Sequence, residues 1–304
     1  MSYSFLRESK LYIVYGGNKY RIYTSTAISF SQTFASDSYS VKTLHNQSKM
    51  FEGATITKAN PADFTFNVPL TEEKDESPVI DLLSQLSSGQ LTQFDMYVQT
   101  GSAVFKLSNA VITSGSFDIN PRSQFTVQLQ GEGTKLERVG DESYSIPGNL
   151  VLESATRTPL LVYPVISIDS LDMNNIISTT VTIENEVDWT AYETLQASLN
   201  VTNASNIMRP SGYTVENRTI SGAVRQYQID NNITQFDDFS TNSNINIKAI
   251  QVGNAANATP FLQLSLNPAT FTARMETGDT FTQSYDFRNL DNSTTVPNII
   301  TQYS

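Results

Sequence analysis

The sequence predicts a mainly β protein made of two tandem domains of similar size. Apolar and polar residues alternate with period two in many segments, and few segments show helical periodicity. Aromatic and β-branched residues are frequent in these alternating segments, as is typical of half-buried antiparallel strands. An approximate repeat at a spacing of about 156 residues also divides the 304-residue chain into two halves of ordinary domain size.

The clearest strands are expected in the first half. Alternation covers residues 10–15, 20–23, 63–68, 95–99, 104–107 and 124–129. Gly16, Gly17 and Asn18 stand between the first two segments, and this composition favours a tight hairpin turn. In the second half, residues 160–163, 165–168 and 179–183 are the corresponding apolar runs.

One helix is expected, at residues 77–86. Val79, Leu82, Leu83 and Leu86 follow the i, i+3, i+4, i+7 spacing of a single helix face. Ser77 is the expected N-cap, with the acidic run 72–76 just before it, near the positive end of the helix dipole. We expect this acidic run to be solvated surface charge. A weaker counterpart of the helix is expected near residues 233–239, so that each domain has one flanking helix.

The repeat matches several residues in the same order. Phe125 corresponds to Phe281, Phe105 to Phe261, Ile28 to Ile183, Met50 to Met208, and the trio Phe64, Phe66 and Val68 to Ile220, Gly222 and Val224. Between residues 138 and 159 the chain is rich in Gly and Pro and lacks sustained periodicity, which indicates a linker. We therefore expect a first domain at 1–145, a linker at 146–159 and a second domain at 160–304.

Composition narrows the possible functions. The chain has no cysteine, which excludes disulfides and thiolate chemistry. No stretch approaches the roughly 18 apolar residues of a membrane helix, and the N-terminus lacks the apolar core of a signal peptide. We expect a protein that is made in the cytoplasm and has no membrane partner. The net charge of −11 opposes tight binding to the phosphates of nucleic acid.

No motif predicts an enzyme. His45 is the only histidine and lies in a polar segment without a nucleophile motif. Carboxylate pairs such as Glu184 and Glu186 lack the spacing of a calcium loop, and no Gly-rich phosphate loop is present. We expect no catalytic, metal or cofactor site.

The order of the expected elements resembles one known family. A strand hairpin follows residues 7–10, and then come a strand at 28–32, a long polar loop, a strand at 62–66, a packing helix and a closing hairpin, with the whole series duplicated. This order resembles the tail tube proteins of long-tailed bacteriophages, and it is closest to the type in which one chain carries two tube domains. The resemblance implies two tail-tube-like β-sandwich or small barrel domains, each flanked by an α-helix.

The resemblance also implies a structural function in the virion tail. Three chains would form a pseudo-hexameric ring, rings would stack into a tube, and DNA would pass through the lumen without specific binding. Partners would be further copies of the chain, the tape measure protein, the baseplate or tip, the terminator and, in a contractile tail, the sheath. Contacts between rings would come from the segment 35–51 and its counterpart 189–208; the candidate residues are Tyr39, Leu44, Phe51, Trp189 and Met208. An acidic lumen would repel DNA phosphates.

The sequence is also compatible with two other classes of protein. A DNA sliding clamp is also acidic, duplicated and trimeric, but its lumen is lined by basic helices, whereas this chain offers about one convincing helix per half at best. A β-sandwich adhesin or carbohydrate-binding module of a phage would expose aromatic platforms, and Trp189 is the single tryptophan.

Overall fold

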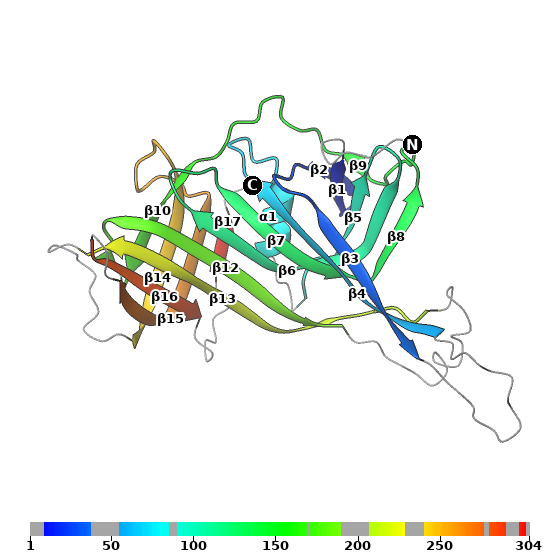
Figure 1. Ribbon diagram of the computed structural model, residues 1–304. Coiled ribbons are helices and arrows are strands. Elements are labelled where there is room, and N and C mark those ends of the chain that lie inside the picture. The colour runs from blue at the N-terminus through cyan, green and yellow to red at the C-terminus, as the bar shows by residue number, and fades with distance from the viewer. Residues whose placement is uncertain are drawn as a thin grey trace, which may run out of the picture.

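The structure is a computed structural model that describes residues 9–37, 55–84, 90–169, 171–189, 207–228, 240–276, 280–289 and 298–301. These residues form seventeen strands and one short helix (Figure 1). The strands make an open mixed sheet that is not closed into a barrel, and the one parallel pairing among the described strands joins β2 to β9. The expected mainly β class is confirmed.

The first half contains nine strands and the helix. β1 (Lys10–Tyr15) and β2 (Asn18–Ile22) form the expected hairpin, and Gly16 and Gly17 have φ values of +57° and +80° in its turn. The remaining strands are β3 (Ser29–Asp37), β4 (Thr55–Pro69), β5 (Phe94–Gln99), β6 (Val104–Ile119), β7 (Thr126–Gly133), β8 (Lys135–Gly140) and β9 (Asn149–Leu150). β4 and β6 are much longer than the alternation predicted, because register shifts restart the period within each strand.

The second half contains eight strands. They are β10 (Val162–Ile168), β11 (Leu171–Asp172), β12 (Ile176–Asp188), β13 (Thr214–Tyr227), β14 (Ser240–Gln251), β15 (Leu262–Glu276), β16 (Thr282–Asn289) and β17 (Asn298–Thr301). The expected second helix, near residues 233–239, lies outside the described residues.

The two halves repeat the same strand pairings. In the first half the pairs are β1–β2, β1–β5, β5–β6, β6–β7, β4–β7, β3–β4 and β6–β8. In the second half the pairs, in the same order, are β10–β11, β10–β14, β14–β15, β15–β16, β13–β16, β12–β13 and β15–β17. The repeat seen in the sequence therefore has a counterpart in the strand topology.

A cross-strand pair of one phenylalanine and one glycine occurs in both halves, with the two residues on exchanged strands, and it aligns the halves. In the first half Phe64 of β4 lies opposite Gly131 of β7, and in the second half Gly222 of β13 lies opposite Phe287 of β16. Because β7 and β16 are equivalent strands, Gly222 is the counterpart of Phe64. The sequence alignment, which matched Gly222 to Phe66, was two residues out of register here, because β4 and β13 are offset differently from β7 and β16.

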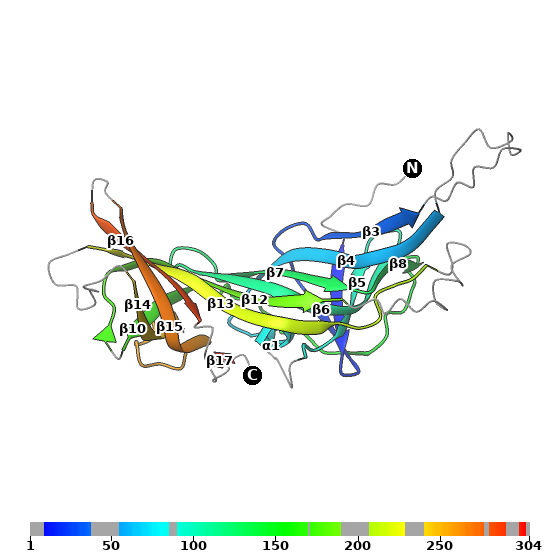
Figure 2. The same cartoon turned by 90° about the horizontal axis from the view of Figure 1, so that it is seen from below.

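One long sheet runs through both halves. Its strand order is β3–β4–β7–β6–β12–β13–β16–β15, and the bond between the halves is the antiparallel pairing of β6 with β12. Six residue pairs make this junction, from Thr179 opposite Ile119 to Glu184 opposite Ser114. Figure 2 shows β12 and β13 running beside β6 and β7 across the middle of the molecule. We call these eight strands the continuous sheet.

The larger of two apolar clusters lies behind the continuous sheet. It includes Leu11 and Phe64 from the first half and Ile247 and Phe287 from the second. Because apolar side chains of both halves are buried from water in this cluster, their packing helps to hold the halves together.

The helix α1 (Ser77–Ser84) packs beneath the junction. Its residues Val79, Ile80, Leu82 and Leu83 are buried, and the Leu83 side chain covers Gly115 of β6 so closely that a Cβ at Gly115 would collide with it. Arg218 of β13 donates to the Leu83 carbonyl at 2.9 Å and so closes the last turn. The helix begins at Ser77, the first residue of the expected range, but the cap differs: the Glu76 carbonyl accepts from the Ile80 amide at 3.5 Å, so Glu76, not Ser77, stands at the cap, and Leu86 lies outside the described residues.

The acidic run before α1 holds the linker, which corrects the expectation of solvated charge. Glu73 accepts from the Thr158 amide at 2.8 Å and from its hydroxyl at 2.7 Å, and Asp75 accepts from the Ser154 hydroxyl at 2.9 Å. Glu76 is 1% exposed and pairs with Arg157 at 3.3 Å. We call these contacts the linker clamp. They fix residues 154–158 to the first half.

The exchanged Phe and Gly positions give a stability prediction. A Cβ at Gly131 would collide with the Phe64 ring and the Val111 carbonyl. We expect Gly131→Ala to lower the free energy of unfolding by about 1–3 kcal/mol, the usual cost of overpacking. Gly212→Ala is the matched control, because a Cβ at Gly212 meets nothing within 4 Å. Urea denaturation of both variants checks the prediction, and equal midpoints would contradict it.

The linker clamp gives a prediction for pH. Hydrogen bonds from Thr158 lower the pKa of Glu73 to about 2, so this carboxylate stabilises the fold above its ordinary pKa near 4.5, and the contribution is lost as pH falls toward 2. We expect Glu73→Gln to be less stable than the wild type at pH 7 and equally stable near pH 2, in urea denaturation across this range. Glu142→Gln is the control, because none of the hydrogen bonds found among the described residues involves that carboxylate. A loss of stability that is independent of pH would count against the clamp.

Candidate assembly interface

At each end of the continuous sheet, a stretch of strand has no partner on its outer side among the described residues, although β14 covers β15 as far as Thr272. Among the described residues β3 pairs with β4 alone, and residues 273–276 at the end of β15 pair with β16 alone. An open edge presents unpaired backbone N–H and C=O groups and is a template for another strand. The two edges lie at opposite ends of the strand order, so a single chain cannot pair them with each other as it stands.

Apolar side chains are exposed at both edges. Met275 of β15 is 49% exposed and Phe34 of β3 is 46% exposed, whereas Phe117 at the internal junction of β6 and β12 is 2% exposed. Phe30 of β3 is half-buried and packs on Phe105 with ring centroids 5.7 Å apart. Exposed apolar groups beside unpaired backbone are typical of an interaction surface.

The outer face of the continuous sheet is polar. Because side chains alternate along a strand, the residues between the core positions all point to this face. They include Ser29, Ser31, Asp63, Thr65, Ser114, Ser116, Asp118, Gln128, Gln130, Glu132, Thr180, Thr182, Glu184, Thr219, Ser221, Arg225, Arg274, Glu276, Ser284, Asp286 and Arg288. We call this surface the polar face. Hydroxyl and amide groups dominate it, and its carboxylates outnumber its guanidinium groups.

Two arginines of the polar face are paired with carboxylates of the same chain. Arg225 forms an ion pair with Glu276, and Arg274 forms one with Asp286. Their positive charge is therefore balanced locally.

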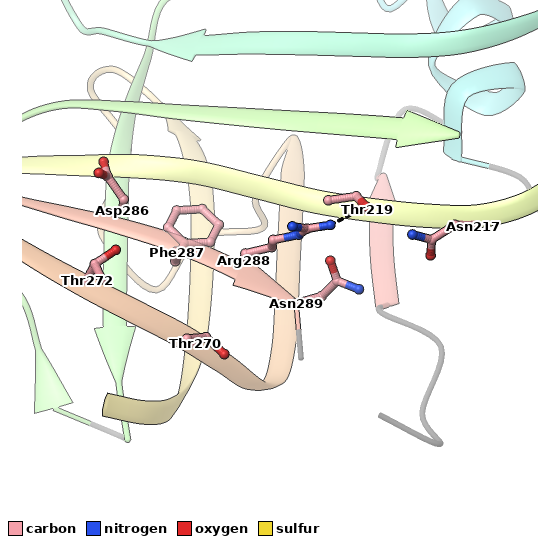
Figure 3. Close-up of a pocket in the computed structure, with 8 residues that line it drawn as sticks. All are labelled: Asn217, Thr219, Thr270, Thr272, Asp286, Phe287, Arg288 and Asn289. Carbon is pink, nitrogen blue, oxygen red and sulfur yellow. Dashed lines mark hydrogen bonds between the residues drawn. The ribbon is translucent and has the colours of Figure 1, made fainter. Parts of the chain in front are cut away.

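A pocket of about 350 Å³ opens on the polar face between β13, β15 and β16 (Figure 3). Arg288 reaches across it and donates to the Thr219 hydroxyl at 3.3 Å. The pocket brings together hydroxyl, amide, Asp286 and Arg288 side chains. Within the described ranges, no group of three or more His, Cys, Asp or Glu residues is placed to hold a metal ion.

Two of the five predicted contact residues are described, and both lie against the first half. The Trp189 indole donates to Glu132 at 2.6 Å, and its ring lies 5.3 Å from that of Tyr213. The Met208 carbonyl accepts from the Ala59 amide at 2.8 Å. Trp189 directly follows β12, and Met208 lies before β13. Both residues therefore contact the first half close to where these two strands end. Tyr39, Leu44 and Phe51 lie outside the described residues.

Burial changes the proton affinity of Glu132. Burial raises its pKa, the hydrogen bond from Trp189 lowers it, and the nearby Asp63 raises it, with a net increase. Trp189 thus supports a carboxylate that is partly withdrawn from water. Its spacing from Glu132 along the chain gives no sequence signal for this contact.

Comparison with known proteins decides between the classes of protein that the sequence left open. Residues 1–303 match the model of the Bacteriophage Baseplate Tube Protein Family. The chain belongs to this family. Comparison with curated proteins finds no significant match. This baseplate tube family member is therefore a structural protein of the phage tail, which favours the tail protein over the sliding clamp and the adhesin.

The sequence predicts no membrane-spanning helix. The described part of this baseplate tube family member contains no helix long and apolar enough to cross a membrane.

The contact between Trp189 and Glu132 is testable. Trp189→Phe keeps a ring against Tyr213 but removes the N–H donor, so we expect a loss of about 1 kcal/mol at pH 7, the usual net contribution of a hydrogen bond, because the acceptor Glu132 is only partly buried. The loss should shrink as pH falls below the raised pKa of Glu132, because the protonated carboxyl needs the donor less. Urea denaturation measures it. In a Glu132→Gln background the same substitution should cost less, and an equal cost in both backgrounds would contradict the coupling.

Proposed function

We propose that the protein forms trimeric, pseudo-hexameric rings that stack to make the part of the tail tube inside the baseplate, a conduit through which DNA leaves the virion. The observation that carries this proposal is the continuous sheet, which crosses both halves and, among the described residues, leaves β3 at one end and residues 273–276 at the other unpaired on the outer side. A surface that binds a different surface on the next copy generates a ring when the rotation closes.

A domain duplication underlies the proposed symmetry. The repeated strand pairings support two tail-tube-like domains at 1–145 and 160–304, joined by the linker at 146–159. Three chains then supply six equivalent positions. The linker clamp supports this arrangement, because it fixes the segment between the halves to the first half.

The polar face would line the lumen. Its hydroxyl and amide groups offer DNA no fixed positive charge, and its excess of carboxylates repels phosphates. Arg225 and Arg274 are already paired with carboxylates, which supports weak attraction for DNA at these positions. The protein would act without catalysis and without a cofactor.

Stacking would use the end of the molecule where β3, β4, β12 and β13 come together. Tyr39, Leu44, Phe51, Trp189 and Met208 are the proposed contacts with the next ring. Other partners would be the tape measure protein, the remaining baseplate or tip proteins, the terminator and, in a contractile tail, the sheath. The site of action would be the virion tail, after synthesis in the host cytoplasm.

Electron microscopy and native mass spectrometry of the purified protein test the proposal. We expect particles of three chains with a central hole and, at high concentration or in the presence of a baseplate nucleus, hollow tubes. Gel-shift measurements with duplex DNA at physiological salt should show no retention, unlike the behaviour of a basic lumen. A protein that stays monomeric under all these conditions would overturn the proposal.

A further inference from the structure

We propose that residues 29–32 of β3 in one chain pair in antiparallel fashion with residues 273–276 of β15 in the next chain, in the register that β12 and β6 use inside the chain. This inference rests on the proposed ring and names the contact that would close it. In this pairing, β3 and the end of β15 take the positions that β12 and β6 occupy in the internal junction.

The internal junction supplies the template. Val181 of β12 lies opposite Phe117 of β6, Thr182 lies opposite Ser116, and Ile183 lies opposite Gly115. The Ser116 and Thr182 hydroxyls hydrogen-bond to each other at 3.3 Å.

The counterpart of β6 is the end of β15. Gly115 lies opposite Leu129 of β7, and Leu129 lies opposite Phe66 of β4. In the second half Ala273 lies opposite Tyr285 of β16, and Tyr285 lies opposite Val224 of β13. Gly115 therefore corresponds to Ala273. By the same step, Ser116 corresponds to Arg274, Phe117 to Met275 and Asp118 to Glu276.

The counterpart of β12 is β3. Val181 lies opposite Gly222, and Phe30 lies opposite Phe64. Since Gly222 and Phe64 are equivalent, Val181 corresponds to Phe30. Thr180, Thr182 and Ile183 then correspond to Ser29, Ser31 and Gln32. This result replaces the sequence match of Ile28 with Ile183, which was displaced by four residues.

The transferred register brings Phe30 opposite Met275, Ser31 opposite Arg274, Gln32 opposite Ala273 and Ser29 opposite Glu276. Phe30 and Met275 occupy the core side of the sheet, as Val181 and Phe117 do. The exposure of Met275 in the single chain then has a cause: β12 covers its counterpart Phe117, whereas among the described residues Met275 pairs with β16 alone.

The charges at the two edges are compatible with this pairing. Arg274 and Glu276 face serines across the proposed junction, and each already has a partner of opposite charge within its own chain. The pairing places no like charges directly opposite each other. Like charges in such positions would destabilise a cross-strand pair.

The proposed junction is shorter than the internal one. Ser240 of β14 pairs with Thr272, which occupies the position equivalent to Ser114, where the internal junction ends. Without this position, the described part of β15 offers residues 273–276, four residue pairs for the next chain against six inside the chain; the counterpart of Ile119, residue 277, lies outside the described residues. The contact between chains would be the weaker of the two.

Engineered disulfides test the register, and the chain has no cysteine of its own to interfere. We expect Ser31→Cys with Arg274→Cys to give covalent dimers and trimers on denaturing gels after oxidation of assembled protein, because directly opposite residues lie within disulfide reach. The control pair, Ser29→Cys with Thr272→Cys, is displaced by four residues, about 13 Å along the strand, and should stay monomeric on the same gels.

A second pair of variants keeps the test independent of the disulfide. We expect Met275→Asp to raise at least tenfold the protein concentration needed for rings, whereas Val252→Asp, with 46% exposure away from both edges, should leave it unchanged. Circular dichroism checks that both variants fold. Rings without the specific cross-link would overturn the register and leave the proposed function standing; a wild type that forms no rings would overturn both.

Discussion

The backbone pairing of β6 with β12 is the interaction on which the rest of the structure depends. It joins two four-stranded groups into the continuous sheet, and the apolar core behind the sheet stays unbroken as a result. Backbone hydrogen bonds fix the register of the halves, while buried side chains such as Phe117 and Val181 supply most of the free energy. Because the pairing consumes one edge of each half, it also decides which two edges remain open.

The sequence predicted much of the fold because the strands alternate clearly. The hairpin of β1 and β2, the helix α1 and the mainly β class all follow from local patterns. The long extents of β4 and β6 do not, since register shifts interrupt the period. The contact residues were harder to predict: Trp189 touches Glu132, which is 57 residues away along the chain, and the open edges at β3 and β15 are properties of pairing that no local pattern contains.

The acidic run before α1 shows that one sequence pattern can correspond either to solvated charge or to a binding site for another segment of the chain. Five residues with four carboxylates are typical of a solvated surface, yet here they receive the amides and hydroxyls of the linker. The linker offers Ser, Thr and Arg at the matching positions. The clamp therefore fixes residues 154–158 to the first half, while the pairing of β6 with β12 sets how the halves are joined.

The Phe64–Gly131 pair and the Gly222–Phe287 pair place the large and the small residue on exchanged strands in the two halves. This exchange decides which hybrids of the two halves could pack. Recombination that moved β4 of the first half next to β16 of the second would place two phenylalanine rings against each other, and the reciprocal product would leave two glycines and a hole. Either hybrid would be less stable than the present chain. The matching strands of the two halves are therefore not interchangeable, although they occupy the same place in the strand order.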